Sequence, residues 1–456
     1  MERNHPVILV HGALGFGPAE LEPVGFRYWG SALRTKPNDL KVFEASVGPL
    51  SSAHDRACEL AAQIKGKRVH YGEDHATEAG HSPEGKSFKD RGFYPEWSDE
   101  NPVHLVGHSL GSPTIRCLQY LLAIDYWGWG SNQNWVKSIT SVSGVCNGNT
   151  ALCALGADEK TGLIPERSIS TALMNVMGVY IGTVEYYNEA IKQFDVLDRI
   201  SSDAIYSFDL EHWGVKRRKG EHFLHYLQRF CETRPDFLTG RDNGLYSLTL
   251  QGAYDDNQAW KTYPNTYYFS YVTEQTHPVD DAKSPQKSHH HPDLKMNPAL
   301  YGAAVYMGSK TFDHDPIPGL RKEQSKWWEN DGAVPTHSQI YPHISGDHQV
   351  GGEFDEQSPS TSFEEGRWYY QWVRDMDHID VVMPYIWDVL ASNDIRFLPD
   401  FVEKATDPYW RLTSWGSRKL ASFLPENVGA LLPLVWRAHR QDELYANLFE
   451  RLMALK

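Results

Sequence analysis

Short apolar runs alternate, over the first 150 residues, with segments whose apolar positions recur every three or four residues. Four of these runs predict buried strands, and they lie in PVILVHGALGFG, KVFEASVGPL, NPVHLVGHS and VKSITSVSGV. Helical spacing follows the third run, at Ile115, Leu118 and Leu122. Strands that are separated by helical runs are typical of a mostly parallel sheet with crossover helices. We therefore expect an α/β fold.

The third strand ends in Gly-His-Ser-Leu-Gly, directly before the helical spacing. Gly107 and Gly111 carry no Cβ, so they leave room for a sharp strand-to-helix turn with Ser109 at its apex. The backbone N–H of Leu110 and the positive end of the helix dipole then face the place where an oxyanion would form. The alternative is an ordinary Gly-bounded turn, but the flanking strand and helix argue against it. The pattern predicts a nucleophilic serine.

A serine nucleophile needs a base and an orienting carboxylate, which follow in the order Ser, acid, His when the turn has this form. The segment WWENDGAVP places Asp331 in an Asn-Asp-Gly turn, and RDMDHIDVV places His378 between acidic residues. We therefore predict Ser109, Asp331 and His378 as a triad. The early loop HGALGFG supplies a second oxyanion donor, the N–H of Ala13, beside that of Leu110.

Composition narrows the class of protein. The chain has 456 residues, is 41% hydrophobic and carries a formal net charge of −15, which argues against nucleic acid as a partner. Its five cysteines are too few and too irregular for a disulfide framework. No run of 18 apolar residues predicts a transmembrane helix. A core strand begins by about Pro6 with no targeting signal before it, which predicts a cytoplasmic protein, or a secreted one if this is a mature form.

Three other segments stand out in the pattern. Residues 54–100 are rich in His, Asp, Glu and Gly and show little periodicity. Residues 167–200 have apolar positions at near-helical spacing between Leu173 and Val184, a pattern more typical of core than of function. The consecutive histidines 289–291 are either metal ligands or part of a solvated loop. We favour the loop, because neighbours in an irregular stretch do not easily converge on one ion.

The motifs together resemble the thermoalkalophilic bacterial lipases, an α/β-hydrolase family with an inserted zinc subdomain. The matching segments run from residue 7 to about 381 and are VILVHGALGFG, GFRYWG, VGPLSSAHDRACE, VHYGEDHATEAGH, VGHSLGS, DLEHWG, PNTYYFSYVTE and WWENDG. The resemblance supports the triad. It also implies an α/β-hydrolase fold with a mostly parallel central sheet, built as a single domain over residues 1–456.

Within that domain the resemblance implies two kinds of insertion. A zinc subdomain would use residues 54–100 and 205–260, and a helical lid would lie at residues 165–205. The last segment, residues 385–456, is a C-terminal extension that the resemblance does not cover, and GALLPLVWRAHRQDELYANLFERLMALK within it is predicted to be helical.

The family holds a zinc ion with two aspartates and two histidines. The matching positions are Asp55, His75, His81 and Asp242. Two nitrogens and two carboxylate oxygens suit a closed tetrahedral site, so the zinc would be structural, and Trp213 of DLEHWG would pack nearby. Without the resemblance, the two histidines would be interpreted as ordinary exposed residues. The competing ligands that stay open are His54, His70, Glu73 and Asp74.

The family's calcium site is incomplete in this chain. Its first carboxylate is matched by Asp380, but the second falls near Tyr385, and a glycine whose carbonyl serves there is matched by Lys295. The substitutions speak against calcium binding.

The leading hypothesis is a serine carboxylic-ester hydrolase, a triacylglycerol lipase that acts through an acyl-enzyme and makes transient contact with a lipid interface. One alternative is an esterase for short, soluble acyl esters. A third hypothesis, of another class, is a non-catalytic lipid-binding descendant, which the intact triad and both glycines argue against.

Overall fold

The computed structural model describes residues 4–18, 27–30, 32–166, 208–218, 221, 223–279, 289–344, 349–382 and 432–455. Its centre is a seven-stranded sheet in which every neighbouring pair is parallel. In sheet order the strands are β10 (Val350–Glu353), β11 (Trp368–Arg374), β7 (Tyr267–Glu274), β6 (Val136–Val142), β5 (Val103–His108), β1 (Val7–Val10) and β2 (Val42–Ala45). The four strands predicted from apolar runs are β1, β2, β5 and β6, so those predictions are confirmed.

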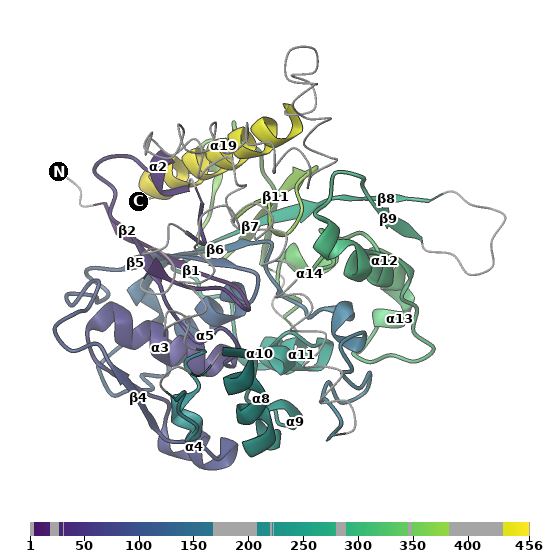
Figure 1. Ribbon diagram of the computed structural model, residues 1–456. Helices are drawn as coiled ribbons and strands as arrows, with labels where there is room; N and C mark the ends of the chain where they lie inside the picture. The colour runs from purple at the N-terminus through teal and green to yellow at the C-terminus, as the bar shows by residue number, and fades with distance from the viewer. Residues whose placement is uncertain are drawn as a thin grey trace, which may run out of the picture.

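Helices cover both faces of this sheet (Figure 1). One face carries α3 (Ala53–Lys65) and α5 (Gly111–Ala123), and the other carries α2 (Ala32–Thr35) and α19 (Leu432–Ala454). Strands covered on both faces are buried along their whole length, which explains why they are continuous apolar runs in the sequence. All six residues of β5 and all four of β1 are buried. The predicted α/β-hydrolase fold is thereby confirmed.

The two faces pack as separate cores because side chains along a strand alternate between them. Ile8 and Leu105 belong to the core under α3 and α5, whereas Val7 and Val106 belong to the core under α19. The predicted C-terminal helix is confirmed as α19. Its buried contributions to the second core are Leu444, Tyr445, Leu448, Phe449 and Leu452, and Leu455 directly after the helix adds to them.

The remaining elements lie around the ends of the sheet. A small antiparallel pair, β3 (Arg68–His70) and β4 (Glu84–Ser87), brackets α4 (Glu73–Ala79). A second pair joins β8 (Thr276–Pro278) to β9 (His290–Pro292). The other helices are α8 (Phe223–Thr233), α9 (Pro235–Thr239), α10 (Gly244–Ser247), α11 (Leu250–Ala259), α12 (Tyr301–Ser309), α13 (Leu320–Glu323) and α14 (Thr336–Gln339). The 3-10 turns are η2 (Gln133–Trp135), η3 (Thr150–Cys153), η6 (Glu211–Trp213), η7 (Pro298–Leu300), η8 (Gln324–Trp327) and η9 (Ser360–Ser362).

Some predictions fall on residues outside this description. The expected lid at 165–205 and the helical spacing from Leu173 to Val184 lie almost wholly in residues 167–207, and Tyr385 lies in residues 383–431. Of the histidine run, His289 stacks on Trp328 and the other two histidines begin β9. None of the three belongs to a metal-ligand group within the described ranges. Among the helices that the structure describes, none combines the length and apolar character that a membrane crossing requires.

Candidate active site and metal centre

Ser109 stands at the turn between β5 and α5 with a φ of 54°. A left-handed backbone is strained for a residue with a side chain, and it is typical of a nucleophile at a strand-to-helix turn. Both flanking glycines are required by close backbone approach. A Cβ on Gly107 would lie 2.4 Å from the carbonyl of Gly111, and one on Gly111 would lie 2.2 Å from the carbonyl oxygen of Val10.

The structure brings Asp331 and His378 together although 46 residues separate them in the chain. The Nδ1 of His378 lies 2.8 Å from Oδ2 of Asp331, and the backbone N–H of His378 donates to the carbonyl of Asp331. His378 follows the end of β11, and its ring lies 4.6 Å from that of His108, the residue before Ser109. The structure thus brings Asp331 and His378 together and places the ring of His378 beside His108, the residue that precedes Ser109.

The carboxylate of Asp331 is fully buried and surrounded by donors. Besides His378 these are the N–H of Ala333 (3.0 Å) and Val334 (2.7 Å) to Oδ1, and Thr273 Oγ1 (2.7 Å) and Gln339 Nε2 (3.1 Å) to Oδ2. Such a set of donors fixes the orientation of the carboxylate. Asp331 can therefore hold the ring of His378 with Nδ1 protonated, which leaves Nε2 as the basic nitrogen.

The loop after β1 closes on the serine. A Cβ on Gly12 would lie 2.7 Å from the Cβ of Ser109, so the loop backbone touches the turn. The N–H groups of Ala13 and Leu110 donate no hydrogen bond to any residue that the structure describes. Two uncommitted amides beside a nucleophile are the requirement for an oxyanion site.

The buried side chain of Arg56 binds the backbone of this loop. The Arg56 guanidinium donates to the carbonyl oxygens of His11 and Gly48, the latter at 2.7 Å, and to Thr114 Oγ1 at 2.9 Å. Burial, aided by the charge of Arg56, lowers the pKa of His11 to about 3, so the ring is neutral. The Nε2 of His11 then accepts from the N–H of Val47. The guanidinium of Arg56, a residue of α3, thereby joins the loop after β1, the segment after β2 and helix α5.

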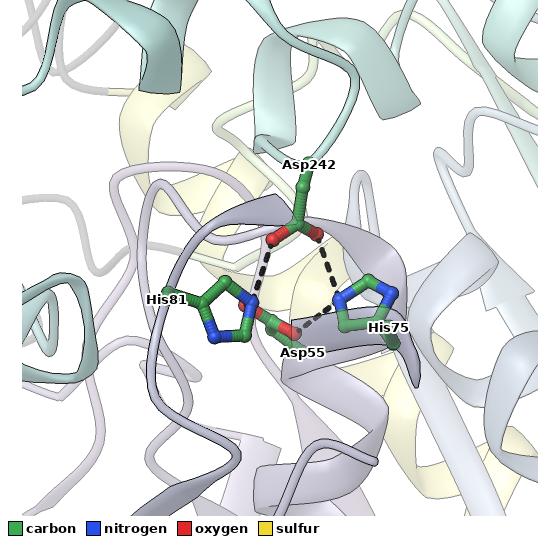
Figure 2. Close-up of side chains that lie close together, drawn as sticks. All are labelled: Asp55, His75, His81 and Asp242. Atoms are coloured by element: carbon green, nitrogen blue, oxygen red, sulfur yellow. Dashed lines mark hydrogen bonds and ion pairs between the residues drawn. The ribbon is translucent and has the colours of Figure 1, made fainter. Parts of the chain in front are cut away.

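A second cluster contains all four predicted metal ligands (Figure 2). One donor atom from each lies within 4.8 Å of the others. The Nε2 of His75 is 3.1 Å from Asp55 Oδ1, and the Nε2 of His81 is 3.0 Å from Asp242 Oδ2. The residues come from α3, α4, the turn after α4 and the turn before α10. A possible metal-binding group therefore exists at the predicted positions.

The chemistry of the cluster fits a cation. The carboxylates of Asp55 and Asp242 share two imidazoles, and the Nε2 of His75 contacts both of them, at 3.1 Å from Asp55 Oδ1 and 3.4 Å from Asp242 Oδ1. Burial opposes the charged form of His75, but its bonds to Asp242 and Asp55 outweigh burial and raise its pKa to about 10. Without a metal, protons must hold the carboxylates together. A divalent ion supplies the same charge and displaces those protons.

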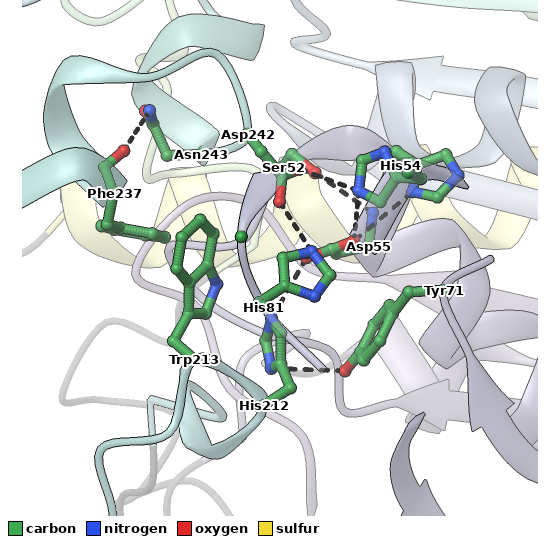
Figure 3. Close-up of polar contacts among 12 residues, drawn as sticks. Ser52, His54, Asp55, Tyr71, His81, His212, Trp213, Phe237, Asp242 and Asn243 are labelled. Atoms are coloured by element: carbon green, nitrogen blue, oxygen red, sulfur yellow. Dashed lines mark hydrogen bonds and ion pairs between the residues drawn. The ribbon is translucent and has the colours of Figure 1, made fainter. Parts of the chain in front are cut away.

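The competing ligands that the sequence left open lie outside the group of four, and Figure 3 shows one of them, His54, beside Asp55. His54 stacks on His75 at 3.7 Å and contacts Asp55, whereas His70 and Glu73 pair with each other at the surface. None of these competitors, nor Asp74, belongs to the group. The predicted packing of Trp213 is confirmed, because its ring lies 5.0 Å from that of His81.

Sequence reasoning missed one member of this environment, His212. Its Nε2 lies 3.1 Å from Asp55 Oδ2, and its side chain is 2% exposed. Tyr71 approaches the other ring nitrogen at 3.4 Å. His212 stands directly before Trp213 in the segment DLEHWG, so the only signal in the sequence was its place beside an expected neighbour of the metal site.

At the calcium position the structure shows internal bonding. Asp380 Oδ2 accepts from the N–H of Asp377, and Asp377 accepts from the N–H of Asn297, Ile379 and Asp380. The N–H of Lys295 donates to Asp293. Among the described residues, no metal-ligand group forms here.

Comparisons with known proteins agree with this geometry. A family model described as the lipase-like, C-terminal domain matches residues 3–192 and 188–404. Lipases from Staphylococcus epidermidis and Staphylococcus hyicus are each 30% identical, over 86% and 75% of this chain. The chain spans about half the length of these curated relatives, 52% and 48% respectively.

Solved structures match most of the chain in both directions. EstA from Clostridium botulinum is 28% identical with a TM-score of 0.66, covering 85% of this chain and 86% of that one. The crystal structure of Staphylococcus hyicus lipase is 28% identical with a TM-score of 0.58, covering 89% and 97%. Lipase 1 from Pelosinus fermentans is 28% identical with a TM-score of 0.61, covering 83% and 93%.

Proposed function

Because this chain belongs to the lipase-like, C-terminal domain family, we propose that it hydrolyses carboxylic esters of lipids, triacylglycerols among them, through Ser109, His378 and Asp331. The observation that carries the proposal is the strained Ser109 beside a buried His378–Asp331 pair whose Nδ1 and Oδ2 are 2.8 Å apart. A non-catalytic lipid-binding protein would gain nothing from this strain or from a carboxylate with five donors.

The reaction would proceed in two steps. Ser109 Oγ attacks the ester carbonyl while Nε2 of His378 takes its proton, and the N–H groups of Ala13 and Leu110 stabilise the oxyanion. The C–O bond to the alcohol breaks, and His378 returns the proton to the departing alkoxide. A water molecule then gives its proton to His378 and attacks the acyl-enzyme, which releases the acid and regenerates Ser109. Asp331 stabilises the imidazolium at each stage.

The test is Ser109→Ala assayed on p-nitrophenyl esters, together with labelling by an organophosphonate that forms a bond only with a reactive serine. We expect labelling of one residue in the parent protein and none in the variant. The control is Ser362→Ala, which removes an exposed hydroxyl in η9. Turnover that persists in Ser109→Ala would assign the chemistry to another nucleophile.

Long-chain substrates and a lipid interface are part of the proposal. The support is the similarity to proteins named as lipases, together with the apolar spacing of residues 173–184. Hydrolysis of a long-chain ester should rise abruptly once droplets form, because the proposed lid would turn its apolar face toward an interface. A rate curve without a break at the solubility limit, with fast turnover of short esters, would favour the esterase alternative.

We further propose that the ligand cluster binds zinc and that the ion is structural. Asp55, His75, His81 and Asp242 supply four donors, which completes a tetrahedron and leaves no position for substrate. The bound ion would neutralise two carboxylates and fix α3 against the turn before α10. Elemental analysis of protein purified from metal-replete cells tests the proposal. Less than about half a zinc per chain would count against it, since one closed site takes one ion.

A further inference from the structure

A buried chain of three hydrogen bonds joins the loop after β1 to the main chain of His378. The N–H of Gly12 lies 2.8 Å from Tyr28 Oη, which lies 2.6 Å from His108 Nδ1. The Nε2 of His108 lies 3.0 Å from the carbonyl oxygen of His378. Tyr28 and His108 are 5% and 2% exposed, so solvent cannot substitute for either partner.

The direction of each bond follows from the groups at its two ends. An amide N–H can only donate, so Tyr28 Oη accepts from Gly12. The single hydroxyl proton of Tyr28 is then given to Nδ1 of His108. A neutral imidazole that accepts at Nδ1 carries its proton on Nε2, and a carbonyl oxygen can only accept. His108 therefore donates to His378, and all three bonds run the same way.

Two physical effects keep His108 in this neutral form. Burial, followed by the neighbouring His378, holds the pKa of His108 well below its usual range. Only one of its two neutral tautomers satisfies both partners, and Tyr28 selects that one. The Tyr28 ring is itself fixed between Phe16 and Trp29, with centroid distances of 5.7 and 5.5 Å.

These three hydrogen bonds connect the segments that carry the proposed oxyanion donor, the nucleophile and the base. Neither Tyr28 nor His108 is proposed to contact substrate. Gly12 precedes Ala13, whose N–H is a proposed oxyanion donor. His108 precedes Ser109, and its Nε2 proton is donated to the carbonyl oxygen of His378, whose backbone N–H and Nδ1 both contact Asp331. A shift of any one of these three segments would change the geometry of the other two.

We propose that Tyr28 and His108 are positioning residues for ester hydrolysis, which keep the oxyanion loop and the backbone of His378 in register around Ser109. The inference rests on the proposed function. Neither side chain exchanges a proton with substrate. Loss of the register should slow the reaction at each active site while leaving the binding of the acyl chain unchanged.

The experiment compares Tyr28→Phe with Tyr445→Phe. Tyr28→Phe keeps the ring but removes the hydroxyl, which orphans the N–H of Gly12 and Nδ1 of His108. Tyr445 is a matched control, because its buried hydroxyl has no hydrogen-bond partner among the described residues. We count the active sites by organophosphonate titration and express kcat per site. The kcat of Tyr28→Phe should fall about 10- to 100-fold while KM stays nearly constant, because a small misplacement of the reacting groups slows the reaction by about that much. Tyr445→Phe should keep the parent kcat.

A second pair of variants tests the hydrogen bond between His108 and the carbonyl oxygen of His378. His108→Gln retains an N–H that can reach the carbonyl of His378, whereas His108→Leu offers none. The glutamine variant should therefore recover much of the kcat that the leucine variant loses. Should Tyr28→Phe fail to fold, this pair still carries the test.

Three results would overturn the inference. They are a parent-like kcat in Tyr28→Phe, a loss explained wholly by fewer titratable sites, and equal kcat in His108→Gln and His108→Leu. Failure of the proposed function is a different result, because the parent protein and Tyr445→Phe would then show neither turnover nor labelling.

Discussion

The Asp331–His378 pair and the cluster of Asp55, His75, His81 and Asp242 are both built on carboxylates, and they differ in how many donors the protein supplies to each carboxylate. Each oxygen of Asp331 has its own donors, five in all, and every donor is part of the protein. In the cluster, Asp55 and Asp242 share two histidines, and the single Nε2 of His75 serves an oxygen of each carboxylate, at 3.1 and 3.4 Å. A buried carboxylate without enough donors is costly, and a cation removes that cost.

The Asp331–His378 pair is preorganised by the protein itself, whereas the cluster would affect stability through a bound ion. Donors that come from the fold hold Asp331 and His378 ready for chemistry whether or not a metal is bound. If the cluster binds the proposed ion, its contribution to stability depends on the metal concentration. One helix joins the two regions, because α3 carries Asp55 in the cluster and, at the next position, Arg56 behind the oxyanion loop.

The largest effect should come from Asp331→Asn. The amide cannot stabilise an imidazolium and favours the wrong tautomer of His378, so we expect kcat to fall by about ten-thousand-fold. His378→Ala should lose at least as much. Both variants should keep the circular dichroism spectrum of the parent. A loss below tenfold in Asp331→Asn would mean that another carboxylate supports the histidine.

Metal removal should have the opposite profile. Stripping the ion should lower the melting temperature strongly, since a ligand present at a thousand times its Kd stabilises the folded state by about 4 kcal/mol. Turnover at 25 °C should change little. His81→Ala should behave in the same way. The matched control is His291→Ala, which removes an exposed histidine from β9.

Two results would contradict this prediction. Prompt loss of turnover on chelation, with the fold intact by circular dichroism, would place the metal in the reaction. An unchanged melting temperature would show that the cluster holds no ion that matters for folding.

The smallest effect should come from His212, which touches Asp55 from outside the ligand set. A partner that orients a ligand in this way typically contributes about 10- to 100-fold in metal affinity. We expect that loss in His212→Ala and a smaller one in His212→Gln, which retains a donor, as measured by competition with a chromophoric chelator. Equal affinity in parent and His212→Ala would show that Asp55 needs no such support.

Several strands, two helices and the turn at Ser109 could be predicted from local sequence. The apolar runs of β1, β2, β5 and β6 and the helical spacing of α5 and α19 are properties of neighbouring residues, so they are visible without a structure. The Gly-His-Ser-Leu-Gly pattern at Ser109 is likewise local, although Gly111 also packs against Val10 of the adjacent strand β1. The choice of Asp331, His378 and the metal ligands used chain order and family resemblance as well, and the residues so chosen do lie together.

Tertiary structure alone decided the groups that support these sites. Tyr28 and His108 are 80 positions apart, and His212 and Asp55 are 157 apart, so no local pattern joins them. With 21 histidines in the chain, the type of residue could not single out the two that act through a neighbour. Sheet order brings such residues together, because parallel strands place distant segments side by side at one edge. Burial then fixes the protonation of these side chains and the direction of their hydrogen bonds. Burial itself arises only when the chain has folded.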